Sequence, residues 1–342
     1  MKYSKITFGS IKSLKNYSHV VLICDSSLNH YKKDLIRKIS NKSVSVISVQ
    51  AKETSKSISQ AIKIYKTLSK KNVDKKSVLV ALGGGVVGDI AGFVASTYLR
   101  GLPFISVPTT ILSQVDSSIG GKNGVNLETG KNLVGTFYQP DSIVIDFNYL
   151  KTLSKREIIS GLGEILKYSI LDKKIKFPEF EDHKFDKSKF LRTIQKLTPL
   201  CVNYKMKLVK KDEHDEKGIR QALNLGHTFG HVLETLTSYK KYKHGEAVIW
   251  GIKFACVVSY SKGLMSFENF RDIMNLANKM DIPKLPKNLN AKKCYEIALK
   301  DKKSYHQTVN MVLLKKIGDI KTRQSVTREE FVEAVNLLKD FS

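Results

Sequence analysis

The segment Val78–Pro140 constrains the fold of this chain more than any other part of its sequence. An apolar, β-branched run over 78–82 leads directly into Gly83-Gly84-Gly85, then into Gly88-Asp89 and a helix-compatible stretch. This order predicts a strand, a tight turn and a helix whose N-terminal N–H groups and dipole suit a phosphate. The spacing of Gly83, Gly85 and Gly88 matches the dinucleotide fingerprint, although a plain strand-to-helix turn uses glycines in the same way.

The residues after this turn are unusually polar for a region of buried composition. Arg100-Gly101 precedes a second short strand, 104–107, which ends at Pro108-Thr109-Thr110 because proline cannot donate to a ladder. Val115–Lys122, with the sequence VDSSIGGK, and Gly130-Lys131-Asn132 follow. Polar groups are costly inside a protein unless they are paired, so their concentration here favours a polar ligand.

Strands and helical stretches alternate over the first half of the chain. This alternation predicts a parallel, Rossmann-like α/β sheet. Asp25 ends the first strand, at the sheet edge where such folds bind ligands, and its carboxylate suits either a ribose hydroxyl or the turn into the next helix. We expect strands over 19–25, 44–49, 78–82, 104–107 and 143–146. Helices are expected over 32–39 and from the residues after Lys56 through Leu68.

Helical periodicity dominates from about residue 153 onward. The charged segment 173–189, which contains Pro178, is predicted to be a surface connection, and only 311–314 looks extended. We therefore expect two domains, an α/β domain over 1–152 and a mainly α-helical domain over 153–342, as the length of 342 residues also suggests. Helices are predicted over 156–171, 190–209, 222–237, 246–261, 267–280, 291–299 and 329–338.

The formal net charge of +26 raises the question of a nucleic-acid partner. The lysines are spread along the whole chain and no long basic run alternates with aromatic residues, so a solvated basic surface that attracts small anions is the preferred interpretation. The four cysteines are far apart in the sequence, which indicates free thiols in a reducing compartment. No segment is apolar enough for a signal peptide or a membrane span. We expect a cytoplasmic protein without a membrane or nucleic-acid partner.

Three segments of the second domain carry candidate metal ligands. Glu164 and Lys167 share a helix face, and His227 and His231 have the spacing of helical zinc sites. The third segment is His244-Gly245-Glu246. One acid with two or three imidazoles is typical of catalytic zinc, whereas a lone histidine is more often a hydrogen-bonded helix residue. Spacing alone favours His227 with His231 as the ligand pair.

The motifs GGGVVGD, YLRG, PTT, VDSSIGGK and GKN, in this order, resemble those of the 3-dehydroquinate synthase family, and LNLGHTFGH and HGE extend the match. The resemblance runs from Asp25 to Lys303. It implies a Rossmann-like NAD-binding domain followed by a mainly α-helical metal- and substrate-binding domain. It also implies NAD and a divalent metal, zinc or cobalt, as cofactors, an anionic sugar-phosphate substrate, and a homodimer.

The implied activity is the second step of the shikimate pathway to chorismate and the aromatic amino acids. The enzyme, a carbon–oxygen lyase, converts 3-deoxy-D-arabino-heptulosonate 7-phosphate to 3-dehydroquinate and phosphate. NAD takes up a hydride and later returns it, the metal polarises the reacting oxygen, phosphate is eliminated, and ring opening and an aldol closure follow. The alternative is another sugar-phosphate cyclase, such as 2-deoxy-scyllo-inosose synthase. A metal-dependent alcohol dehydrogenase shares the GGG turn but lacks VDSSIGGK and GKN.

The resemblance also implies roles for individual residues. Glu164, His227 and His244 would bind the metal, which leaves His231 to contact the substrate. Lys122, Lys167, Lys205 and His231 would be catalytic. Substrate binding would add Arg100, Asn132, Arg220, Asn224 and Lys302. Cofactor binding would fall to Asp25, Glu53, Lys56, Gly83, Gly84, Gly85, Val86, Asp89, Thr109, Thr110, Asp116, Ser117, Lys122, Lys131, Asn132, Thr152, Leu153 and Glu157.

Overall fold

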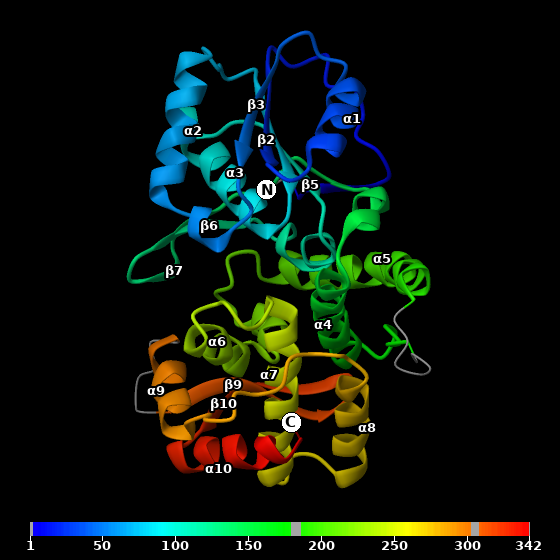
Figure 1. The fold of residues 1–342 in the computed structure, drawn as a ribbon, viewed down its shortest axis with the longest axis vertical. Helices are drawn as coiled ribbons and strands as arrows, with labels where there is room; N and C mark the ends of the chain where they lie inside the picture. Colours follow the sequence, from blue (N-terminus) through cyan, green and yellow to red (C-terminus); the bar gives the residue numbers. More distant parts are fainter. Residues whose placement is uncertain (1–2, 179–185, 302–307, 342) are drawn as a thin grey trace. The chain divides into compact units, whose positions relative to one another are not determined.

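The computed structural model describes residues 3–178, 186–301 and 308–341, and it divides into two compact units, Met1–Leu153 and Ser154–Ser342. The first unit is a parallel α/β sheet with helices, and the second is mainly helical (Figure 1). This confirms the predicted fold class.

The first unit is organised around a six-stranded sheet in the order β1-β8-β5-β4-β2-β3. Every adjacent pair in it is parallel, as the alternation of strands and helices predicts. The edge strand β1 was not among the predicted strands, because it is short and mostly exposed. The strands are β1 (Lys5–Phe8), β2 (Val20–Asp25), β3 (Val44–Val49), β4 (Val78–Gly83), β5 (Phe104–Pro108) and β8 (Ser142–Ile145), and the helices are α1 (Asn29–Ile39), α2 (Ile58–Lys70) and α3 (Gly85–Thr97).

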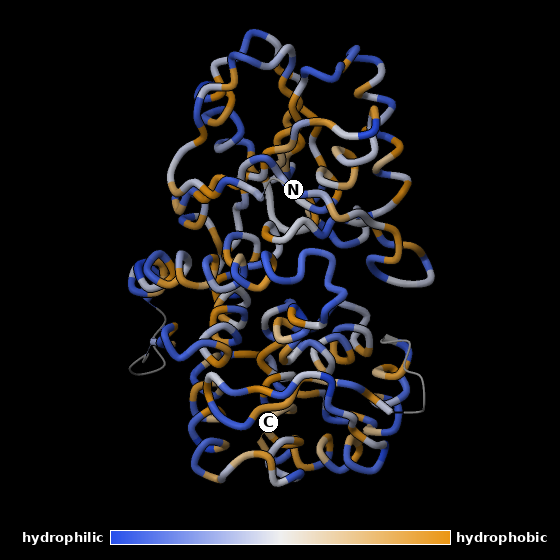
Figure 2. Tube along the Cα trace, turned by 180° about the vertical axis from the view of Figure 1, so that it is seen from behind, coloured by the Kyte–Doolittle hydropathy of each residue, from blue (hydrophilic) through white to orange (hydrophobic). Residues whose placement is uncertain are grey.

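Successive residues of a strand point to opposite faces of the sheet, and both faces of this sheet are covered. Val21 and Ile23 of β2 pack in one buried cluster with residues of α2 and α3. Val20, Leu22 and Cys24 point to the other face and pack in a second cluster with Leu35 and Ile39 of α1. Burial on both sides explains why these strands are continuous hydrophobic runs. Figure 2 shows this as orange strands inside the unit, with blue segments toward its outside.

The strand order reverses between β2 and β4. From β2 the chain adds β3 on one side and then returns to add β4 on the other side. The parallel register pairs Cys24 with Leu82, so Asp25 and Gly83 lie at adjacent carboxyl ends. In open α/β sheets, ligands bind at such a switch point, so the topology places the glycine-rich turn where a cofactor is expected.

The antiparallel hairpin of β6 (Lys122–Leu127) and β7 (Gly130–Phe137) is an element that the sequence did not predict. Its residues are polar and glycine-rich, and they lack a regular alternation. The hairpin packs against α3. The contact is so close that a Cβ on Gly92 of α3 would lie 1.9 Å from the Asn123 side-chain oxygen. Tertiary packing therefore determines this hairpin more than local strand propensity does.

The second unit is built around α7, which is buried from Gly245 to Ser259. On one side of α7, Phe254 stacks on Phe229 with ring centroids 4.4 Å apart and contacts Phe331 at 4.7 Å. The elements are α4 (Lys155–Leu171), α5 (Lys187–Lys211), α6 (His227–Leu236), α7 (His244–Ser261), α8 (Phe267–Asn278), α9 (Ala291–Asp301), β9 (Val309–Lys316), β10 (Asp319–Val326) and α10 (Arg328–Leu338).

Two predictions for this unit are wrong. The helix expected over 222–237 is instead a 3₁₀ turn over Ile219–Asn224 followed by α6, because Gly226 has a φ of +79° that an α-helix cannot accommodate. The extended region is also not limited to 311–314, since β9 pairs with the polar strand β10. β10 shows little hydrophobic signal because most of its residues are exposed or half-buried.

Two further expectations concern the thiols and the membrane. All four cysteines are free and buried, as their spacing predicts. Among the residues that the structure describes, no helix has the length and apolar character that crossing a membrane requires.

Candidate metal centre and nucleotide site

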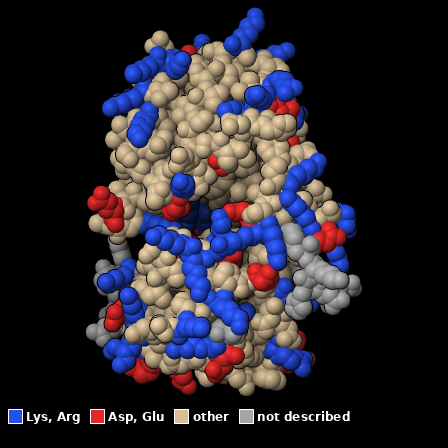
Figure 3. Space-filling model, viewed as in Figure 1, with Lys and Arg blue, Asp and Glu red and all other residues tan. Residues whose placement is uncertain are grey.

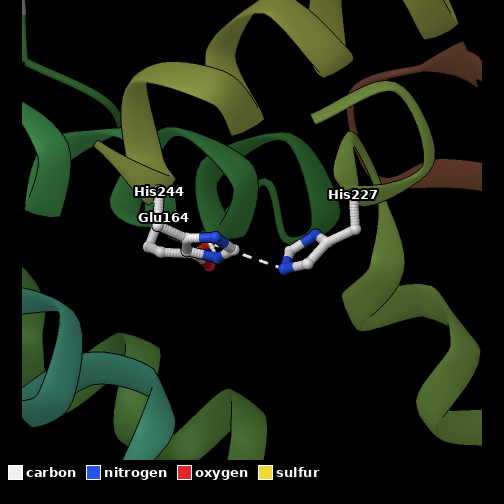
Figure 4. A group of neighbouring side chains, drawn as sticks. All are labelled: Glu164, His227 and His244. Carbon is white, nitrogen blue, oxygen red and sulfur yellow. Dashed lines mark ion pairs between the residues drawn. The ribbon is translucent and has the colours of Figure 1, made fainter. Parts of the chain in front are cut away.

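Glu164, His227 and His244 converge in the second unit (Figure 4). Glu164 lies on α4, and the two histidines are the first residues of α6 and α7. The Oε1 atom of Glu164 lies 3.4 Å from His244 Nε2 and 3.7 Å from His227 Nε2. One ligand atom from each residue fits within 4.8 Å of the other two. One carboxylate oxygen and two imidazole nitrogens therefore surround a single point.

Glycines beside these ligands allow the helices to approach closely enough. A Cβ on Gly163 would lie 2.3 Å from the carbonyl oxygen of Gly245, and a Cβ on Gly245 would lie 1.7 Å from that of Ser160. Similarly, a Cβ on Gly251 would lie 1.7 Å from the carbonyl oxygen of Gly226. No side chain fits at these backbone contacts, so the glycines next to Glu164, His227 and His244 are required to bring the three together.

Burial of the Glu164 carboxylate is compensated by a cation one helical turn away. The side chain is 0% exposed, which is costly for a charge unless it is paired. Lys167 Nζ makes a close ion pair with Glu164 Oε2. Since Oε1 is the oxygen that faces the histidines, the lysine and a metal ion can use different oxygens of the same carboxylate.

The two histidines differ in charge. Burial and the nearby Lys167 charge lower the pKa of His227 to about 3, so its imidazole is neutral. Burial also opposes protonation of His244, but hydrogen bonds to Glu164 and Glu234 outweigh it and raise the pKa to about 10. A metal ligand must be a neutral imidazole, so a divalent ion bound at this point would have to displace the proton from His244 Nε2.

The donor set fits a divalent transition metal. A carboxylate oxygen with two imidazole nitrogens is a typical zinc set, and the same donors suit cobalt. A second group within the described residues, His231 with Glu234 and His244, also has its ligand atoms within 4.8 Å. His231 is therefore in a different ligand group from Glu164. The pair that helical spacing favours, His227 with His231, is divided between the two groups.

Several basic and polar residues assigned to the substrate lie in the same unit. Lys167 and Lys205 are buried, on α4 and α5. Arg220 is also buried and donates from Nη1 to the Glu213 carbonyl oxygen at 2.7 Å, so it is not an exposed surface residue. Asn224 lines a pocket together with Gln221, Asn310 and Arg323. Lys302 lies outside the described residues.

The turn after β4 has the features of a pyrophosphate site. Gly84 caps α3, whose first turn contains Gly85 and Val86. A Cβ on Gly83 would lie 2.6 Å from Val87 Cβ, so this glycine serves packing, whereas a Cβ on Gly88 would meet nothing within 4 Å. Gly88 lines a pocket with Asp89, Ser117 and Lys122. The open space beside the Gly88 backbone therefore fits the close approach of a dinucleotide.

Five residues assigned to the nucleotide form one network with a further residue, Asn126. Buried Lys56 pairs with Asp89 and donates to Asn132 Oδ1, and Lys131 Nζ lies 3.8 Å from Glu53 Oε1. The sequence analysis missed Asn126, which no motif singled out. It donates to Glu53 Oε1 at 2.8 Å and accepts from the Asn132 backbone N–H at 3.0 Å, so it positions both.

The remaining cofactor residues of the first unit lie at strand and turn ends. Asp25 Oδ1 accepts from the Ser27 N–H at 2.9 Å, which is the turn role that its position also allows. Thr109 donates its N–H to the Gly83 carbonyl oxygen at 3.0 Å, and Thr110 follows β5. Asp116 and Ser117 lie in a π-helical turn over Ser113–Ser117, a type of turn frequent at functional sites.

The structure separates a few residues from these groups. Arg100 is exposed beyond the C-terminal end of α3, whereas the glycine-rich turn lies at its N-terminal end. Thr152 and Leu153 lie at the end of the first unit. Glu157 belongs to the second unit, where it forms a close ion pair with Lys243. The contacts of Thr152, Leu153 and Glu157 do not by themselves indicate a nucleotide, and the exposed position of Arg100 does not by itself indicate the substrate.

Glu234 is a second residue that the sequence analysis missed. Its Oε2 lies 3.5 Å from His244 Nδ1, and the residue is buried. A signal was present in the sequence, because Glu234 is three residues after His231 and seven after His227, on the same helix face.

Comparisons with known proteins cover most of the chain. The models of the 3-dehydroquinate synthase N-terminal and C-terminal domains match residues 46–160 and 161–304. The 3-dehydroquinate synthase of Clostridium acetobutylicum is 39% identical over 324 residues, which cover 94% of this chain and 90% of that protein. That of Pelagibacter ubique is 40% identical over 316 residues, which cover 89% and 84%.

A solved structure extends this likeness to the fold. The 2-epi-5-epi-valiolone synthase of Streptomyces hygroscopicus subsp. jinggangensis 5008, solved with NAD+ and Zn2+ bound, has a TM-score of 0.86 and 22% identity, and the match covers 100% of this chain and 99% of that one. At this identity the match supports the fold, while the sequence matches carry the family assignment. The chain belongs to the 3-dehydroquinate synthase family.

Proposed function

We propose that this enzyme converts 3-deoxy-D-arabino-heptulosonate 7-phosphate to 3-dehydroquinate and phosphate, with NAD and a divalent zinc or cobalt ion as cofactors. Family membership supports the reaction. The observation that carries the proposal is the convergence of Glu164 Oε1 with the Nε2 atoms of His227 and His244, beside the buried cation Lys167. In this proposal residues 1–152 bind NAD, and residues 153–342 hold the metal and the substrate.

Glu164, His227 and His244 would hold the metal, and the turn Gly83–Val86, Asp89 and the Lys56 network would hold NAD. When bound, NAD supplies reversible hydride transfer and the ion supplies Lewis acidity toward the reacting oxygen. Because Lys167 engages Oε2 of Glu164, Oε1 stays directed toward the two imidazoles, where it would bind the metal. Half-buried Asp89 and buried Lys56 link α3 to the β6–β7 hairpin, which keeps the N-terminal N–H groups of α3 in place for a pyrophosphate.

The substrate has two anionic ends, and the proposal assigns cations to each. Lys122, Lys167 and Lys205 bind the phosphate end and steer the proton transfer there, and His231 contacts the substrate. Arg220 binds the carboxylate end, and the other proposed substrate-binding residues are Asn224, Lys302, Asn132 and Arg100. Arginine suits this role because its planar guanidinium pairs with both oxygens of a carboxylate. Lys and Arg side chains are also spread over the face shown in Figure 3, on both units, and they outnumber the acidic ones there, which favours encounter with a dianionic substrate.

The proposal extends to a homodimer in the cytoplasm, where free thiols such as the four found here stay reduced. Sedimentation at low micromolar concentration tests the dimer, and a monomeric mass would contradict it.

The decisive experiment measures phosphate release from the heptulosonate phosphate by the purified enzyme, with and without NAD and with and without a chelator. The reaction has no net oxidation, so we expect many turnovers for each NAD and no accumulation of NADH. Chelation should stop the release, and added zinc or cobalt should restore it. Glucose 6-phosphate serves as the comparison, because it lacks a carboxylate. Turnover of glucose 6-phosphate in place of the heptulosonate phosphate would favour a cyclase such as 2-deoxy-scyllo-inosose synthase.

A further inference from the structure

His244 faces a different carboxylate with each of its ring nitrogens. Nε2 lies 3.4 Å from Glu164 Oε1, and Nδ1 lies 3.5 Å from Glu234 Oε2. Glu234 comes from α6 and is only 7% exposed, so its carboxylate is held in the interior beside the imidazole. Because His244 is shared by both candidate ligand groups, the proton on its ring decides which nitrogen can bind a metal.

His227 shows how a fixed proton selects the ligand atom. Its Nδ1 lies 3.1 Å from the carbonyl oxygen of Leu225. A carbonyl only accepts, so Nδ1 must carry the hydrogen. The Nε2 atom of the neutral ring is then left with its lone pair, and it is this atom that faces Glu164. A backbone group therefore directs His227 toward the group that contains Glu164.

We infer that Glu234 is the positioning residue of the metal centre: it accepts the Nδ1 hydrogen of His244 and thereby directs His244 Nε2, with His227 Nε2 and Glu164 Oε1, to one divalent ion. This inference rests on the proposed function only for the presence of the metal. Glu234 does for His244 what the Leu225 carbonyl does for His227, so both imidazoles present Nε2 to the same carboxylate oxygen.

The alternative ligand group is poorly compatible with these contacts. If His231, Glu234 and His244 held the ion, His244 would bind through Nδ1 and its Nε2 hydrogen would face Glu164. His227 Nε2 would then remain beside Glu164 without a role in coordination. Carboxylate partners of metal-bound histidines commonly orient the ring and raise its basicity, and their removal weakens metal binding by roughly 10–100-fold.

The test measures metal affinity rather than activity. Apo-protein is prepared with a chelator, and the dissociation constants for zinc and cobalt are determined by chelator competition for the wild type, Glu234→Gln and Glu234→Ala. Exposed Glu333 on α10 provides the matched control, Glu333→Gln. We expect affinity to fall roughly 10–100-fold in the Glu234 variants and to remain unchanged in the control. The visible spectrum of bound cobalt should shift in Glu234→Gln, because the ring orientation changes while the ligands remain.

His231→Ala separates the two ligand groups without altering Glu234. Under the inference this variant keeps wild-type metal affinity, and its loss of metal would overturn the inference even if the Glu234 variants fold poorly. Equal affinity in Glu234→Gln, Glu234→Ala and the wild type would overturn it as well. A wild-type protein that binds neither zinc nor cobalt would instead defeat the proposed function, so the two failures are distinguishable.

Discussion

The Nε2 atom of His244 lies 3.4 Å from Oε1 of Glu164, although the two residues belong to separate helices. The approach depends on the glycines next to them, Gly245 and Gly163, whose backbones leave no room for a Cβ. Ligand chemistry and helix packing are therefore specified by the same short stretches, GLGE and HGE.

Replacing either imidazole should remove the metal. In His227→Ala or His244→Ala, one carboxylate and one imidazole remain, which is too few protein ligands for a stable catalytic zinc site. We expect metal content, measured by atomic spectroscopy after dialysis, and phosphate release to be lost together. His30→Ala, an exposed change on α1, is the control and should retain both. Turnover by a metal-free His227 or His244 variant would refute the ligand assignment.

A single methyl group at Gly245 should disrupt the centre through packing. Its Cβ would lie 1.7 Å from the Ser160 carbonyl oxygen, and neither backbone can move without separating α4 from α7. We expect Gly245→Ala to lower the free energy of unfolding by about 1–3 kcal/mol or more and to weaken metal binding. Urea titration and metal competition check this, with the exposed change Ser261→Ala at the other end of α7 as control. Unchanged metal affinity would show that the helix contact is not what assembles the ligands.

The alternation of strands and helices predicted the α/β unit well because burial on both faces makes β2 and β4 continuous apolar runs. The β6–β7 hairpin and β10 were missed because both are polar and depend on contacts with distant segments. A contact such as that of Gly92 with Asn123 has no signature within a sequence window.

The candidate site shows the same limit. The spacing of His227 and His231 places both on one helix face. It gives no information about where α4, which carries Glu164, lies relative to that helix. The family resemblance supplied that residue. Neither approach found Asn126 or Glu234. The helix face that Glu234 shares with His227 and His231 could have indicated it, but its contact with His244, like that of Asn126 with Glu53, joins separate elements of the fold.

Two glycines of α3 should respond differently to alanine. A Cβ on Gly88 meets nothing within 4 Å, whereas one on Gly92 would lie 1.9 Å from the Asn123 side chain. Gly88→Ala should therefore fold, with stability equal to or up to about 1 kcal/mol above the wild type because alanine favours helix. Its NAD affinity, measured by calorimetry, should fall if a dinucleotide fills the open space. Gly92→Ala should lose stability instead, and wild-type NAD affinity in Gly88→Ala would argue against the site.

Arg220 should affect the substrate more than either cofactor. It is buried, and its backbone N–H donates to Asp212 Oδ2 at 3.3 Å, a contact that does not need the side chain. Arg220→Lys keeps the charge but loses the planar guanidinium, so we expect kcat/KM to fall roughly 10–100-fold. Arg220→Ala also loses the charge and should fall further, while both variants retain NAD and metal binding. Steady-state kinetics and binding titrations check both. Global unfolding of Arg220→Lys would point to a structural role.

Lys253 is a buried lysine on α7 that lies away from the ligand end of the helix. It is 4% exposed, and its Nζ lies 4.3 Å from the centroid of the Trp250 ring. Burial lowers its pKa from 10.5 to about 8, because the charged form is poorly solvated in the interior. Below about pH 8 the folded protein therefore carries a buried charge that the unfolded chain exposes to water.

Replacing this lysine by Lys253→Met should stabilise the protein in a pH-dependent way. Between pH values of about 8 and 10.5 the unfolded chain binds more protons than the folded one, so the stability of the wild type rises with pH in this window. The stabilising effect of methionine should consequently be largest near neutral pH and should shrink by about 2 kcal/mol by about pH 9.5. Urea unfolding of both proteins at the two pH values measures this, with the exposed change Lys292→Met on α9 as control. An equal effect at both pH values would mean that Lys253 is not held in a desolvated environment.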